Sequence, residues 1–175
     1  ANGWTYVWIV TAVGGTHVVL RKVEMAAVFD QIRRERITML CAAPTVLIGI
    51  ANAPEDMRRT LPRGLRVMTA GAPPAAATIE RVEEELGWHV THLYGRTESY
   101  GPATLGAGQD AWHGLPPEAR ARQMARQGVA MPTLAGVRVA DPATGHDVAR
   151  DGGAMGEVLL RGNIVMKGYL KNPAA

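Results

Sequence analysis

The feature that most constrains this 175-residue chain is the alternation of short strand-like runs with amphipathic stretches in its first hundred residues. In residues 24–36 the apolar side chains recur every three or four positions, which predicts a helix with one buried face. Residues 37–42, 65–70 and 89–93 are short apolar runs that favour strands. Strands that alternate with helices form βαβ units, so the sequence predicts an α/β fold with a parallel sheet.

Three further elements complete this expected α/β subdomain. The β-branched run at residues 18–20 predicts a short strand. Pro44 is tolerated at a first helical position, so a second helix is expected through residue 50. A third helix is expected over residues 75–86, with Gly87 as its stop.

The sequence changes character after residue 105, which suggests a division into three parts. Residues 1–105 form the α/β subdomain, and residues 106–135 form a connector with an Arg-rich surface helix at about 116–127. Residues 136–175 are expected to begin a smaller, β-rich, barrel-like subdomain of short strands and turns. The predicted strands of that part are residues 137–139, 156–162 and 165–169.

Composition excludes several classes of function. With 47% hydrophobic and 20% charged residues, the chain has the composition of a globular protein. Its formal net charge of +3 is spread among mixed charges, so no nucleic-acid partner is expected. The apolar runs are shorter than the roughly 18 residues of a membrane span. With Cys41 as the single cysteine, no intrachain disulfide can form, which favours a cytoplasmic location. A cysteine in an apolar run is more often a small buried side chain than a catalytic one.

Two glycine-containing segments follow predicted strands. In open α/β sheets ligands bind beyond the carboxyl ends of the strands, where Gly71-Ala72-Pro73 and Tyr94-Gly95-Arg96-Thr97-Glu98 are expected. The second segment offers an aromatic ring, a glycine that allows close backbone approach, a hydroxyl and a carboxylate. A nucleotide with bound Mg²⁺ needs these groups. The same residues are also typical of an ordinary turn after a strand.

The run Tyr94-Gly95-Arg96-Thr97-Glu98 resembles the Tyr-Gly-x-Thr-Glu signature of the adenylate-forming superfamily of acyl-CoA synthetases, peptide-synthetase adenylation domains and luciferases. Gly71, 23 residues before Tyr94, lies in a segment similar to the adenine loop of that superfamily. Residues 156–162 and 165–173 resemble its later Gly-Glu and Gly-Tyr stretches. The resemblance covers the whole chain. Residues 2–4 and 14–18 look most like the fatty-acyl or medium-chain CoA ligase branch.

The resemblance implies a reaction, its cofactors and a set of site residues. ATP and a carboxylic acid would give acyl-AMP and pyrophosphate, and coenzyme A would then displace AMP. Glu98 would hold Mg²⁺. The remaining nucleotide contacts would come from Gly71, Ala72, Pro73, His92, Leu93, Tyr94, Gly95 and Thr97, with Tyr94 stacked on adenine and Thr97 at the α-phosphate.

Two further roles implied by the resemblance have alternatives. Trp4, with Gly71, would line the acyl pocket, and core packing is an equal alternative for Trp4. Lys22 could contact a coenzyme A phosphate, although a lone lysine is usually solvated. The other four histidines, His17, His89, His113 and His146, have no metal-ligand spacing. A Ser-His-Asp arrangement is not expected, because Ser99 is the only serine.

The chain is expected to be an internal piece of such a ligase. The phosphate loop, rich in Ser, Thr and Gly, has no counterpart in a chain with one serine. The ribose-binding Asp and the carboxy-terminal catalytic Lys of the superfamily would lie beyond residue 175. The expected partners are the rest of the same polypeptide, the acid, ATP and coenzyme A, with a homodimer possible. The competing hypotheses are a stand-alone nucleotide-binding module and an interaction domain.

Overall fold

The computed structural model describes residues 5–172, which form two compact units. The first unit contains the chain up to Tyr94 together with Leu105–Val129. The second contains Gly95–Thr104 and the chain from Ala130 onward. The division at residues 105 and 135 suggested by the sequence stays a prediction.

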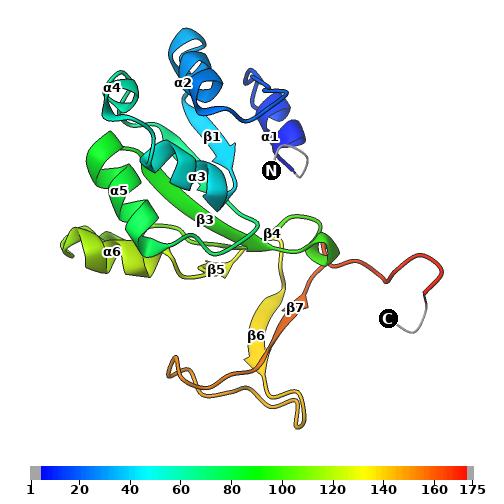
Figure 1. Cartoon of the computed structure of the whole chain (residues 1–175). Helices are drawn as coiled ribbons and strands as arrows, with labels where there is room; N and C mark the ends of the chain where they lie inside the picture. The colour runs from blue at the N-terminus through cyan, green and yellow to red at the C-terminus, as the bar shows by residue number, and fades with distance from the viewer. Residues whose placement is uncertain (1–4, 173–175) are drawn as a thin grey trace. The chain divides into compact units, whose positions relative to one another are not determined.

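A five-stranded sheet is the central feature of the fold (Figure 1). Its order is β1-β2-β3-β4-β5, and both β1 with β2 and β2 with β3 pair in parallel. This confirms the predicted α/β class with a mostly parallel sheet. The strands are β1 (Met39–Ala42), β2 (Arg66–Thr69), β3 (His89–Gly95), β4 (Pro102–Leu105) and β5 (Val129–Ala130).

The helices of the first unit supply most of its core. α2 (Met25–Arg34) and α3 (Pro44–Ala51) confirm the predicted periodicity and the predicted proline start. α5 (Ala76–Leu86) ends at Gly87, which adopts the left-handed conformation (φ 64°). α5 lies beside α6 (Pro117–Met124) in Figure 1. The largest fully buried side chains include Phe29 and Ile32 from α2, Leu47 and Ile50 from α3, Ile79 and Val82 from α5, and Trp88 just before β3.

Two predicted strands are wrong. Residues 18–20 have no regular structure, and Val19 is 64% exposed. Among the described residues no strand pairs with them. A strand without a partner would leave its backbone N–H and C=O groups unpaired. Residues 165–168 are irregular as well, and the first two give their N–H groups to turns instead of to a strand. The Val165 N–H donates to Gly162 O (3.1 Å) and the Met166 N–H to Glu98 O (2.8 Å).

Several short elements were not predicted. α1 (Tyr6–Ala12) precedes the irregular stretch, and α4 (Glu55–Arg58) forms one turn in the polar segment. β4 extends the sheet at the end of the expected α/β subdomain, and β5 extends it within the expected connector. No helix within residues 5–172 has the length and apolar character that a membrane crossing needs.

The second unit contains a small antiparallel sheet of β6 (Gly136–Ala140) and β7 (Glu157–Arg161). Its register runs from Gly136 opposite Arg161 to Ala140 opposite Glu157. After β6 the chain turns at Asp141, whose carboxylate accepts the N–H groups of Ala143 (2.7 Å) and Thr144 (3.0 Å). This unit supplies the β-rich part that the sequence predicts.

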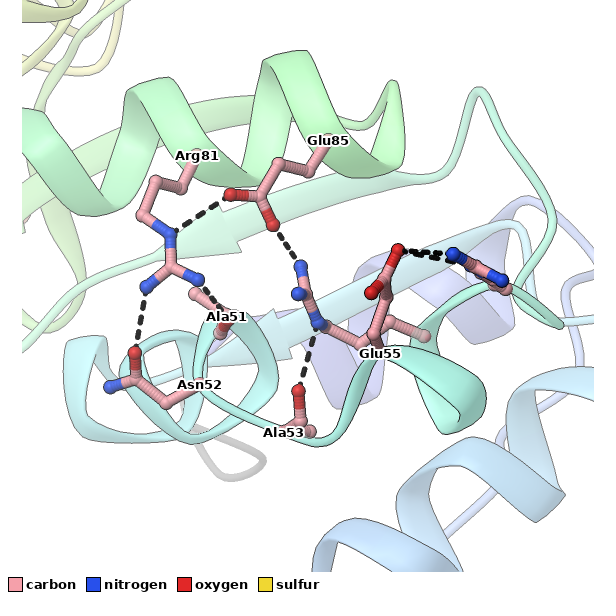
Figure 2. Close-up of polar contacts among 8 residues, drawn as sticks. Ala51, Asn52, Ala53, Glu55, Arg81 and Glu85 are labelled. Carbon is pink, nitrogen blue, oxygen red and sulfur yellow. Dashed lines mark hydrogen bonds and ion pairs between the residues drawn. The ribbon is translucent and has the colours of Figure 1, made fainter.

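A polar network joins α5 to the end of α3 in the first unit. Arg81 donates to the carbonyl of Ala51 (2.7 Å), to Asn52 Oδ1 (2.7 Å) and to Glu85 Oε1 (3.1 Å), as Figure 2 shows. Arg58 donates to Ala53 O (2.9 Å) and to the other oxygen of Glu85. The last carbonyls of a helix lack hydrogen-bond donors within the helix. Arg81, on α5, supplies such a donor to the carbonyl of Ala51 at the end of α3. The hydrogen bonds from Arg81 and Arg58 lower the pKa of Glu85.

Arg81→Ala should therefore lower the free energy of unfolding by about 1–2 kcal/mol, because it leaves a helix-end carbonyl and Asn52 without their donor. The control is Arg122→Ala, which removes only an exposed pair with Glu118 (2.5 Å) and should cost no more than about 0.5 kcal/mol. Urea unfolding followed by tryptophan fluorescence measures both, since Trp88 is buried. Equal losses in the two variants would contradict the helix-end role.

Candidate functional site

The first unit brings two of the predicted segments to one edge of the sheet. Thr69 at the end of β2 is the register partner of His92 on β3, and the two strands run parallel. The carboxyl ends of β2 and β3 therefore lie at the same edge of the sheet, where the loop after β2 begins. Gly71 has φ 99°, a conformation that side-chain-bearing residues rarely adopt, and Gly71, Ala72 and Pro73 are all exposed. The loop thus presents its backbone to solvent.

The residues that end β3 differ in burial. His92 (2% exposed) and Leu93 are buried, and Tyr94 is half-buried. His92 Nδ1 lies 3.3 Å from the carbonyl oxygen of Arg126, and burial lowers the pKa of His92, which favours the neutral ring. The neighbouring Thr69 hydroxyl is buried and has no hydrogen-bond partner among the described residues. His92 is thus held by packing and by a main-chain contact.

The second unit contains a tight turn that carries the rest of the Tyr94–Glu98 segment. Residues Thr97–Ser99 form a single 3₁₀ turn. The buried Ser99 hydroxyl accepts the N–H of Arg96 (2.9 Å) and lies 3.0 Å from the carbonyl oxygens of Arg96 and Gly101, to one of which it donates. Thr97 is exposed and the Glu98 side chain is 33% exposed. The turn thus buries its serine and presents a hydroxyl and a carboxylate.

Glycine is required at the start of this turn. A methyl group added at Gly95 would lie 2.1 Å from the carbonyl oxygen of Gly101, far inside contact distance. Gly101 in turn donates its N–H to Ser99 O (2.7 Å). The backbone therefore doubles back so closely that only a residue without a side chain fits at position 95.

The Glu98 carboxylate has two neighbours in the second unit. The Tyr169 hydroxyl donates to Oε1, and Arg96 Nε lies 3.7 Å from Oε2. The hydrogen bond from Tyr169 lowers the pKa of Glu98 and raises the pKa of Tyr169. Glu98 is therefore ionised at neutral pH. Tyr169 was not among the predicted site residues, although it belongs to the Gly168-Tyr169 pair that carries part of the resemblance.

Glu98 fits a metal that is held jointly with a phosphate ligand. Mg²⁺ prefers oxygen and is usually bound by one or two carboxylates, substrate phosphates and water. Glu98 supplies one ionised and accessible carboxylate. Among residues 5–172 no group of three His, Cys, Asp or Glu side chains gathers into a metal cage. One accessible carboxylate thus suits a cation that takes its other ligands from a bound phosphate and water.

Comparison with known proteins identifies the family to which this chain belongs. A family described as "AMP-binding enzyme" matches residues 1–170. The chain belongs to this family. The match confirms the resemblance to the adenylate-forming superfamily that the Tyr94–Glu98 segment carries.

Individual relatives agree with this assignment. The chain is 44% identical, over 99% of its length, to the peroxisomal acetate/butyrate–CoA ligase of Arabidopsis thaliana, and 46% identical, again over 99%, to a 2-methylpropanoate–CoA ligase of Humulus lupulus. An amide bond synthetase from Marinactinospora thermotolerans has the same fold, with a TM-score of 0.72 and 30% identity over 93% of this chain and 30% of its own. The chain spans 31% of the length of the two CoA ligases.

Two predicted residues remain, Trp4 and Lys22. Trp4 lies outside the residues that the structure describes. Lys22 forms an ion pair with Glu24 (2.7 Å), and its side chain is 81% exposed. Lys22 is therefore exposed to solvent, and its contact with coenzyme A stays a prediction.

Gly95→Ala should lower the free energy of unfolding by about 1–3 kcal/mol, the usual cost of forcing a methyl group into a packed position. Gly136→Ala is the matched control in the same unit, since a methyl group there would have no heavy atom within 4 Å. Thermal unfolding followed by circular dichroism compares the two variants. If Gly95→Ala and the control variant have the same unfolding midpoint temperature, the close approach of position 95 to Gly101 is absent in solution.

Proposed function

We propose that this chain is part of a longer ATP-dependent acyl-CoA ligase. In the proposed reaction a carboxylate oxygen attacks the α-phosphorus of ATP, forming acyl-AMP and releasing pyrophosphate. The thiol of coenzyme A then attacks the acyl carbon and releases AMP. The family match over residues 1–170 and the CoA ligase relatives support this proposal.

The observation that carries the proposal is the accessible carboxylate of Glu98 on a hydrogen-bonded turn, in a chain that belongs to the AMP-binding enzyme family. Phosphoryl chemistry of this kind depends on positioning and charge neutralisation more than on a protein nucleophile. In the proposal Glu98 binds Mg²⁺ and Thr97 donates to the α-phosphate. The other proposed nucleotide contacts are the exposed loop of Gly71, Ala72 and Pro73, and His92, Leu93, Tyr94 and Gly95 around the end of β3.

The proposed substrate is an aliphatic carboxylic acid. Relatives named for acetate, butyrate and 2-methylpropanoate act on short aliphatic acids, which favours this class. Membership of the fatty-acyl or medium-chain branch stays a prediction, and so does the acyl-pocket role of Trp4. The cytoplasmic location also stays a prediction, since the Arabidopsis relative is peroxisomal.

The remainder of a longer polypeptide is the proposed partner of the first unit. Helix α1 and the residue after it expose large apolar side chains, among them Trp8 (68% exposed) and Val13 (77% exposed). Apolar groups clustered in this way usually contact other protein. Relatives that are about three times as long as this chain have the additional sequence to cover them.

Glu98→Gln in the longer ligase should lower acid-dependent ATP–pyrophosphate exchange about 100-fold or more, because the metal's charge stabilisation amounts to several kcal/mol and about 1.4 kcal/mol is a factor of ten. Glu118→Gln removes an exposed carboxylate on α6 and should leave the exchange unchanged. Radioactive pyrophosphate incorporation into ATP measures both variants. Full exchange in the Glu98 variant would refute the metal role.

The 175-residue chain by itself should show no acid-dependent exchange and only weak binding of AMP, because a single serine and one short loop supply few phosphate donors. Isothermal titration calorimetry with AMP and the same exchange assay test this. Tight AMP binding by the chain alone would favour the alternative of a stand-alone nucleotide-binding module.

A further inference from the structure

Two segments that lie far apart in the sequence converge on Glu98 within the second unit. The Met166 N–H donates to the main-chain oxygen of Glu98 (2.8 Å). The Tyr169 hydroxyl donates to the Glu98 carboxylate, across 71 positions of the chain. One contact fixes the backbone of Glu98 and the other fixes the end of its side chain. Both ends of the stretch from Met166 to Tyr169 are therefore hydrogen-bonded to the same residue, Glu98.

The two carboxylate oxygens of Glu98 have different surroundings. Oε1 accepts the hydrogen bond from Tyr169, whereas the ion-pair partner of Oε2, Arg96 Nε, is 3.7 Å away and beyond hydrogen-bond distance. The Arg96 side chain is itself 66% exposed. A neutral hydroxyl thus holds the carboxylate at Oε1, whereas the largely exposed Arg96 forms an ion pair with Oε2 and no hydrogen bond.

The chemistry of the donor matters for a carboxylate that binds a cation. A glutamate side chain has several rotatable bonds, and ordering it has an entropic cost that a fixed hydrogen bond offsets in advance. A guanidinium at hydrogen-bond distance would also neutralise the charge that attracts the cation. A tyrosine hydroxyl orients the oxygen and leaves the negative charge in place. Partners of this kind commonly orient metal ligands.

The geometry points to Tyr169 as a positioning residue that holds the Glu98 carboxylate in the orientation in which it binds the nucleotide-associated divalent cation. This inference rests on the metal role proposed for Glu98. It gives the Gly168-Tyr169 segment a specific role, because the ring reaches back to the turn that carries Glu98. The preceding Gly168 adopts φ 152°.

The test measures metal binding directly, in the longer ligase. Mn²⁺ replaces Mg²⁺, a non-hydrolysable ATP analogue with a methylene bridge between the α- and β-phosphates is present, and electron paramagnetic resonance reports free Mn²⁺. Tyr169→Phe keeps the ring and removes the hydroxyl. It should weaken Mn²⁺ binding about tenfold, the lower end of the effect usual for partners that orient metal ligands. Tyr6→Phe removes a hydroxyl from the first unit and should bind Mn²⁺ like the unmodified protein.

A double-mutant cycle separates positioning from general structural support. With Glu98→Gln already in place, adding Tyr169→Phe should change Mn²⁺ affinity less than about twofold, because the hydroxyl no longer has its carboxylate to orient. An equal loss in both backgrounds, or full Mn²⁺ affinity in Tyr169→Phe alone, would overturn the positioning role. If Glu98→Gln alone binds Mn²⁺ normally, the proposed metal role of Glu98 fails, and this inference fails with it.

Kinetics give a second measurement, which distinguishes a positioning role from a general loss of folded enzyme. In Tyr169→Phe the Mg²⁺ concentration for half-maximal exchange should rise about tenfold, while the rate at saturating Mg²⁺ stays within about twofold of the unmodified ligase. A rate that falls without any change in Mg²⁺ requirement would overturn the inference.

Discussion

The parallel pairing of β2 with β3 is the constraint on which the first unit depends. Val67 and Val90 are register partners on the two strands, and both are buried. A shift of the register by one residue would turn these side chains to the opposite face, so the core fixes the alignment. The ends of the two strands are consequently fixed as well. The positions of the Gly71 loop and of Tyr94 therefore follow from core packing and need no ligand to establish them.

The geometry of the turn after β3 separates the group that holds the turn together from the groups that it exposes. A 3₁₀ turn has three residues per turn, so consecutive side chains point in directions about 120° apart. Ser99 points inward and binds the backbone, whereas Thr97 and Glu98 are accessible. The turn is held by Ser99 and by the close approach of Gly95 to Gly101. Thr97 and Glu98 are thus available to a ligand without being needed for the fold of the turn itself.

The sequence predicted the helices better than the strands, and the reason is physical. A helix makes its hydrogen bonds within one segment, so the periodicity of α2 and the proline at the start of α3 suffice to place them. A strand bonds to a different segment. The β-branched run at residues 18–20 has the composition of a strand but no partner strand among the described residues. The N–H groups of Val165 and Met166 donate to turns. Local composition carries no information about such partners.

The same distinction applies to the candidate site. The residue types between Tyr94 and Glu98 are local, so the sequence suffices to nominate them. Proximity along the chain would favour Arg96 as the partner of Glu98, yet Arg96 remains at 3.7 Å and the hydrogen bond comes from Tyr169. Because that donor is neutral, the carboxylate is fixed without losing its charge. In the proposed metal role, a cation that arrives with a nucleotide would meet an oriented anion whose ion-pair partner, Arg96, is 66% exposed.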